Sequence, residues 1–163
     1  MAIFQQSLKG FTLLELVLTI AVLGVITATA VPLFTQSDSF AVSDASRQLE
    51  SDIQYAQNLA TSSGEAYGFR TISGDDIHSN YEIYNVDTDE VVTSPYDHEP
   101  MQEDFAESYG NTIFVNDNHD IQFGETGSPT IVTGDNTIPI SNDDGTATST
   151  IEIIESTGMI RIQ

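Results

Sequence analysis

A long apolar run with one carboxylate near its start constrains this chain more than any other feature. The run extends from Phe11 to Phe34, and Glu15 is its only charged residue. As an α-helix it would measure about 36 Å, which is enough to cross a hydrocarbon core of about 30 Å. An ionised carboxylate near mid-bilayer costs on the order of 2.5–3.5 kcal/mol, and less near the end of the run. The sequence therefore predicts a membrane-spanning helix whose Glu15 needs a cationic partner.

Two residues inside this run are poor helix formers. Gly24 and Pro32 interrupt the apolar pattern, and proline removes a backbone donor and clashes with the preceding turn. We expect a kink or local melting between Leu23 and Pro32. The alternative is that both residues are simply tolerated, as they often are in membrane helices.

The residues that follow, 35–62, predict an amphipathic continuation of the same helix. Apolar residues recur there at spacings of three or four, while the intervening positions are largely polar. The apolar positions are Val42, Ala45, Leu49, Ile53, Ala56 and Leu59. Ser62 to Gly64 form a plausible stop, so the two segments together predict one helix of roughly 50 residues.

Residues 63–163 predict a β-rich globular domain. Short segments rich in β-branched and aromatic residues alternate there with Gly, Asp and Asn turn signals. The expected strands are 66–72, 81–86, 90–93, 112–115, 120–123, 130–133, 137–140, 150–154 and 159–162. The stretch from Ser94 to Gly110 is expected to be a long loop or irregular crossover. The fold class is thus α+β, with a long N-terminal helix packed on an antiparallel β-rich domain.

The charge balance is strongly acidic. The chain has 25 Asp and Glu residues against four Lys and Arg residues, and its formal net charge is −21. Nucleic-acid binding needs clustered basic side chains, so this function is disfavoured. The acidity indicates either a solvated surface suited to a salty medium or recognition of a basic partner or divalent cation. The absence of cysteine excludes disulfides and thiolate metal sites.

The segment around the start of the apolar run resembles the type IV pilin and type II secretion pseudopilin family. Lys9, Gly10, Phe11 and Glu15 match its basic leader residue, its cleavage site and the Glu at the fifth position of the mature chain. The resemblance implies that residues 1–10 are a leader, which a prepilin peptidase removes after Gly10. The same enzyme would then methylate the amine of Phe11. In the assembled filament, Glu15 would pair with the Phe11 amine of a neighbouring subunit.

Weaker matches in the rest of the chain are similar to the H-type, or GspH/FimT-like, minor pseudopilins. They comprise Tyr55-Ala56 before a glycine turn, the segment Ile121 to Gly124, and the closing segment Glu155 to Ile162. The chain departs from that pattern because it has few arginines around the helix and tail, where only Arg47 and Arg161 lie. This departure places a shared basic contact surface in doubt.

This resemblance implies a minor pseudopilin, a structural subunit of the initiating tip of a type II secretion pseudopilus that aids export of folded proteins across the outer membrane. It would lie in the bacterial inner membrane as a single-pass protein, with its C-terminal domain in the periplasm. The implied partners are the prepilin peptidase/methyltransferase, other major and minor pseudopilins or pilins, the inner-membrane assembly platform and, for the acidic domain, secreted cargo. No cofactor is implied.

Two other functions remain open at this point. One is a minor pilin of a type IV pilus, because the leader motif is common to both assemblies. The other is a soluble secreted acidic β domain. Lys9, the apolar run and the small residues Ala28 to Ala30 also match a secretory signal peptide, which would be cleaved after Ala30.

Catalytic and metal-binding motifs are weak. His78, His98 and His119 are far apart and are expected in polar loops, and no nucleophile elbow or zinc motif occurs, so we expect no enzyme activity. Two oxygen-rich loops offer weak calcium candidates, namely Asp117 and Asp120 in one and Asp143 and Asp144 in the other. Neither has EF-hand spacing, and turn-forming Asx residues explain both loops as well.

Overall fold

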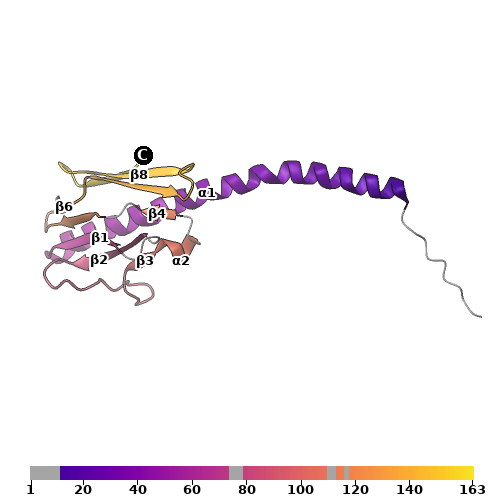
Figure 1. Cartoon of the computed structure of the whole chain (residues 1–163). Coiled ribbons are helices and arrows are strands. Elements are labelled where there is room, and N and C mark those ends of the chain that lie inside the picture. The colour runs from indigo at the N-terminus through magenta and orange to yellow at the C-terminus, as the bar shows by residue number, and fades with distance from the viewer. Residues whose placement is uncertain (1–11, 74–78, 110–112, 116–117) are drawn as a thin grey trace, which may run out of the picture. The chain divides into compact units, whose positions relative to one another are not determined.

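The computed structural model describes residues 12–73, 79–109, 113–115 and 118–163, and it leaves the side chains of 27–38, 73, 79, 106 and 107 undescribed. The chain divides into two compact units, Met1–Ser37 and Asp38–Gln163. Helix α1, Leu13–Ser63, contributes its first part to one unit and its second part to the other (Figure 1). The predicted helix is therefore present over almost its whole expected length.

The second part of α1 is amphipathic, as its sequence predicts. Val42, Ala45, Leu49, Ile53 and Ala56 are all buried. The next buried position is Ala60, whereas Leu59, which we expected on the apolar face, is not among the buried residues. The helix ends at a glycine cap, because Gly64 has φ +73° and its N–H donates to the carbonyl of Ala60 at 3.1 Å.

The first of two antiparallel sheets has the strand order β3-β2-β1-β5-β6. Its strands are β1 Tyr67–Ser73, β2 Ser79–Asn85, β3 Gln102–Asp104, β5 Asp120–Phe123 and β6 Pro129–Thr133. Strands β1 and β5 are neighbours although they are far apart in sequence, and the pairing of β5 with β6 shifts register between Asp120 and Ile121.

The second sheet has the order β4-β7-β8-β9. Its strands are β4 Ile113–Val115, β7 Thr137–Asn142, β8 Thr148–Ile154 and β9 Met159–Ile162. From β7 to β9 the chain forms a meander in which each strand pairs with the next one in sequence. Strand β4 joins from outside this meander by pairing with β7.

Both sheets pack with the second part of α1 around one hydrophobic core. Alternate residues along the strands point into it, as expected for sheets with one buried face. The fully buried large side chains from the sheets are Phe69, Tyr81, Ile83, Ile113, Ile121, Phe123, Ile138, Ile140, Ile151 and Ile153. The α+β fold class predicted from sequence is confirmed, with an N-terminal helix packed on antiparallel sheets.

The stretch from Ser94 to Gly110 differs from our expectation of a long irregular loop. It contains β3 and the short helix α2, Phe105–Tyr109. Phe105 is fully buried and its ring lies 5.3 Å from that of Tyr81, so this segment contributes to the core. The acidic composition of this segment did not indicate this role, because only a few residues of the segment face the core.

The expected strand at 90–93 is also wrong. Only single bridges form there, between Tyr84 and Val91 and between Thr93 and Pro100. The first bridge holds the segment after β2 against β2 itself, and the second connects this segment to the residues just before β3. The segment is thus an ordered connection, held by backbone hydrogen bonds, and not a strand of the sheet.

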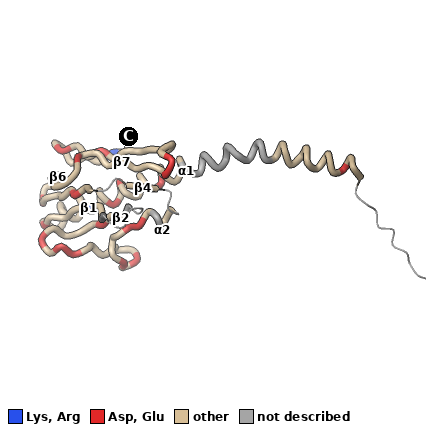
Figure 2. Tube along the Cα trace, in the orientation of Figure 1, with Lys and Arg blue, Asp and Glu red and all other residues tan. Residues whose placement is uncertain are grey.

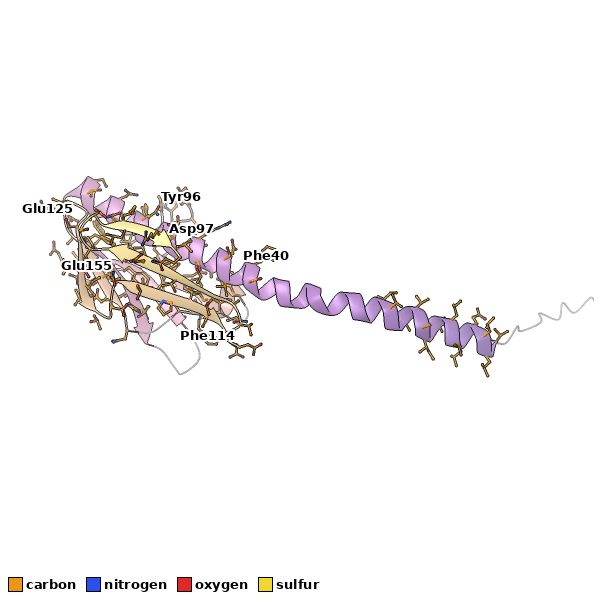
Figure 3. The ribbon with its side chains drawn as sticks, turned by 90° about the horizontal axis from the view of Figure 1, so that it is seen from above. Phe40, Tyr96, Asp97, Phe114, Glu125 and Glu155 are labelled. Carbon is orange, nitrogen blue, oxygen red and sulfur yellow. The ribbon has the colours of Figure 1, made fainter. Side chains whose placement is uncertain are left out.

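Gln57 joins the helix to both sheets. Its side-chain amide donates to the carbonyl of Gly127 and to that of Gly158, each at 2.8 Å. Gly127 lies in the turn between β5 and β6, and Gly158 in the turn between β8 and β9; Glu125 and Glu155, labelled in Figure 3, belong to the same two turns. One helical side chain therefore fixes the ends of two hairpins from different sheets.

Candidate functional site

The N-terminus of α1 positions the Glu15 carboxylate. The Glu15 N–H donates to the hydroxyl of Thr12 at 3.3 Å and to its carbonyl at 3.1 Å. Thr12 thus occupies the N-cap position and Glu15 the third helical position, which is the spacing of a capping box. The partial positive charge at a helix N-terminus also favours a carboxylate there. The spacing Thr-x-x-Glu is the signal in the sequence that indicates this cap, although we did not predict it.

The apolar side chains around Glu15 lie exposed on every face of the helix. Residues 13–26 are all exposed, from 80% for Leu13 to 51% for Val22 among the large apolar ones. A helix that is apolar all round is normally buried by something else, because so large an apolar surface is unfavourable in water. Glu15 is the single charge on this surface. The segment therefore has the composition of a buried helix, but the described residues of its own unit do not bury it.

Some predictions for this segment concern residues outside the described ones. Lys9, Gly10 and Phe11, the predicted leader and processing residues, are among these. The α-helix assignment includes Gly24 and Pro32, but the side chain of Pro32 is not described, so the expected kink stays a prediction.

Within the described part of the chain, no helix is long and apolar enough to cross a membrane.

The globular unit is acidic, and two of its arginines pair with carboxylates of the same unit. Figure 2 shows in red that Asp and Glu positions are spread over its turns and loops. Arg70 pairs with Glu82 at 2.5 Å and with Asp89 at 2.7 Å, and Arg161 pairs with Glu152 at 2.5 Å. These are the ion pairs between the described side chains. Most of the described acidic surface is therefore left without a cation from the described part of the same molecule.

A polar network around Tyr84 ties β1, β2 and β5 together. The Arg70 guanidinium lies 4.1 Å from the centre of the Tyr84 ring. The Tyr84 hydroxyl donates to Asp120 at 2.7 Å and accepts from Gln122 at 2.9 Å. Burial, followed by the bond to Asp120, raises the pKa of Tyr84 to about 12. All members have partners, so the network joins the three strands and stabilises the sheet.

The calcium candidates are separated or already engaged. Asp117 lies outside the described residues, and Asp120 accepts the Tyr84 hydrogen bond. Asp143 and Asp144 are exposed in the turn between β7 and β8. Across the residues that the structure describes, no group of three or more His, Asp or Glu side chains could hold a metal ion.

The histidines do not share a site among the described residues. His98 is exposed in a turn with φ +64°, and His78 lies outside the described residues. His119, expected in a polar loop, is instead only 4% exposed, and neither of its ring nitrogens has hydrogen-bond geometry to a described residue. Burial lowers the pKa of His119, and nearby Asp135 only partly opposes this shift. The packing of the β5 start against Gly134 buries it, which the polar sequence could not indicate.

Comparison with solved structures shows which known proteins this fold is similar to. The minor pseudopilin EpsH from the type 2 secretion system of Vibrio cholerae superposes with a TM-score of 0.53 at 14% identity, over 75% of this chain and 95% of that one. The chain has a pilin-like fold. The type IV minor pilin FimU of Pseudomonas aeruginosa, in two crystal forms, gives TM-scores of 0.47 and 0.48 at 18% and 19% identity. Those matches cover 74% and 75% of this chain and 91% and 87% of FimU.

No family model matches the sequence, and no curated protein matches it either. The pilin-like fold therefore rests on the likeness to solved structures, and it agrees with the resemblance found in the sequence.

Proposed function

We propose that this chain is a structural subunit of a pilin-type filament, specifically a minor pseudopilin of a type II secretion pseudopilus. The observation that carries the proposal is the exposed and largely apolar start of α1, residues 13–26, with Glu15 as its single charge. Such a surface is stable only when other apolar groups cover it, first lipid and then the helices of neighbouring subunits. The pilin-like fold of the globular unit supports the same assignment.

In this proposal the precursor is inserted in the inner membrane with Lys9 on the cytoplasmic side, and a prepilin peptidase cuts after Gly10. The new Phe11 amine is a cation near the depth of Glu15. When subunits bundle, Glu15 of one pairs with the amine of its neighbour. An unpaired charge in the bundle would cost several kcal/mol, whereas the matched pair largely offsets its own desolvation. The pair therefore selects the axial register of the subunits.

Processing is tested first, by intact mass and N-terminal peptide mapping of the protein from its native membrane. The expected mature chain begins at Phe11 and carries one extra methyl group. A chain that begins at Val31 would overturn the proposal, because the apolar helix would then be absent from the mature protein.

Assembly is tested with two variants that separate the charge of Glu15 from the helix cap of Thr12. Glu15→Gln removes the charge, whereas Thr12→Ala removes the N-cap and leaves the charge in place. We expect both variants to be processed, and Glu15→Gln alone to lose incorporation into filaments, measured by chemical cross-linking of the subunits in cells and immunoblotting. Normal incorporation of Glu15→Gln would overturn the pairing, and equal loss in Thr12→Ala would show that the charge of Glu15 is not the deciding feature.

The choice of assembly is tested by co-purification of the cross-linked native protein. Recovery with secretion components supports the pseudopilus. Recovery with pilus components would assign the chain to a type IV pilus and leave the filament role intact.

A further inference from the structure

A groove of about 330 Å³ lies between α1 and the loop that precedes β3. The helix contributes Asp52 and Tyr55, which lie on one face of its second part. The facing wall is formed by Ser94–Asp97 and Pro100–Glu103. The groove lies entirely within the globular unit, and Figure 3 labels Tyr96 and Asp97 on its loop wall.

The loop wall is an ordered structure. The Ser94 N–H donates to the Glu99 carbonyl at 2.8 Å, and the Met101 N–H donates to the Val92 carbonyl at 2.7 Å. The Asp97 carboxylate accepts from the Glu99 N–H at 3.2 Å. These bonds, together with the bridge between Thr93 and Pro100, hold the wall against the edge of the sheet. The groove is therefore a consequence of the fold.

Carboxylates of the groove lack a cation among the described residues. Asp52 accepts a hydrogen bond from the hydroxyl of buried Tyr81 at 2.6 Å, and Glu103 accepts one from the hydroxyl of Ser108. The described ion pairs all belong to Arg70 and Arg161, and none involves Asp52, Asp97 or Glu103. Burial, with the nearby charge of Glu103 as a smaller contribution, raises the pKa of Asp52. A cation entering the groove would relieve this repulsion.

Aromatic and apolar groups stand beside these carboxylates. The Tyr96 side chain is 93% exposed, and Tyr55, Pro95 and Met101 also line the groove. A ring face attracts an ammonium or guanidinium group, and apolar surface packs against the methylene stem of lysine or arginine. A hydrated divalent cation would gain nothing from the rings, and an anionic ligand would be repelled. The lining thus matches a long cationic side chain.

We propose that this groove binds a lysine or arginine side chain presented by a partner protein. The charge at the end of the stem pairs with Asp52 and Glu103, and its methylene groups pack on Tyr55 and Tyr96. The net charge of −21 attracts a basic partner from a distance, and the groove supplies the specific contact. This proposal does not depend on filament assembly, because the groove is complete in one globular unit.

The test uses the full-length protein in non-ionic detergent micelles, with ring-labelled tyrosine observed by NMR. The probe is the peptide acetyl-Gly-Lys-Arg-Gly-amide, and its matched control has glutamine and citrulline in place of lysine and arginine. We expect the cationic peptide to shift the Tyr55 and Tyr96 ring signals in a saturable manner, and the neutral peptide not to do so. Equal shifts with both peptides would overturn the proposal.

Variants then locate the binding site. Tyr96→Ala and Glu103→Gln are expected to weaken peptide binding by about three- to fivefold, from the loss of one cation–π contact or one exposed charge pair. Asp143→Asn, which makes the same charge change as Glu103→Gln outside the groove, is the control and should change binding by less than about twofold, since a distant exposed charge is largely screened. If Asp143→Asn weakens binding as much, the attraction is diffuse and the groove is not a site.

Two further outcomes would assign the groove to another occupant. Saturable displacement of the peptide by Ca²⁺ at equal stoichiometry would make it a metal site. Concentration-dependent self-association that Arg47→Gln abolishes would make the occupant a second copy of this chain, since Arg47 is exposed on the same helix. Either result would replace the proposed partner.

Discussion

The contact of Gln57 with two glycine turns predicts an unusually large effect for Gly158→Ala. Gly158 has φ +69°, and a left-handed conformation costs an alanine about 1–2 kcal/mol. A Cβ atom there would also lie 2.5 Å from the Gln57 amide nitrogen and 2.6 Å from the Gly127 carbonyl oxygen. To relieve this overlap the turn must move, which breaks two hydrogen bonds worth about 1 kcal/mol each. The expected total loss of stability is about 3 kcal/mol.

Gly145→Ala is the matched control. Gly145 has nearly the same conformation, with φ +63°, but a Cβ atom there meets nothing within 4 Å. It therefore carries the conformational cost alone, partly offset by the lower entropy of the unfolded alanine chain. We expect a loss of about 1 kcal/mol. The difference between the two variants isolates the contribution of the packed turn.

The assay is urea denaturation of the full-length protein in non-ionic detergent, followed by near-ultraviolet circular dichroism of the tyrosines. Free energies of unfolding come from linear extrapolation, and the m-value should not change. Gln57→Ala alone should lose about 2 kcal/mol, and the double variant with Gly158→Ala should lose less than the sum, since both act on the same hydrogen bonds. Equal losses for Gly158→Ala and Gly145→Ala, or strict additivity with Gln57→Ala, would refute the reasoning.

Three further predictions concern charge and burial. The lowered pKa of His119 means that the unfolded chain takes up a proton as pH falls through about 6.5 while the folded chain resists it, so stability is lost as pH falls through and below this value. His119→Leu should reduce this loss in thermal melts and the exposed His98→Gln should not; an unchanged pH dependence in His119→Leu would contradict the assignment. Arg70→Met should destabilise the protein by about 2 kcal/mol in urea, because Glu82, only 7% exposed, loses its cation. Arg161→Met, whose pair with Glu152 is more exposed, should cost clearly less, and the reverse order would disprove the role of burial. Gly68→Ala should also destabilise the sheet measurably, because its Cβ would lie 2.6 Å from the Tyr84 ring, whereas Gly124→Ala meets no atom within 4 Å and should differ little from the parent.

For residues 9–34, which we propose take part in assembly, the sequence indicated the function because the signals are local. The apolar run, its single carboxylate and the residues Lys9 to Phe11 are adjacent in the chain, and the resemblance to pilins rests on them. The Thr-x-x-Glu spacing is a local signal as well, and it indicates the capping role of Thr12. What the sequence could not show is how exposed the helix surface is, since exposure depends on which other segments cover it.

The same distinction holds for the globular unit. Periodicity alone determined the amphipathic phase of α1 and the position of most strands, because side chains at spacings of three to four, or of two, fall on one face regardless of the partner. Only the tertiary structure decided that β1 pairs with β5, that Phe105 enters the core and that His119 is buried. It alone brought Asp52 beside Glu103 and Gln57 beside two distant turns. Each of these contacts joins residues far apart in the chain, and its free energy depends on the packing of the whole domain.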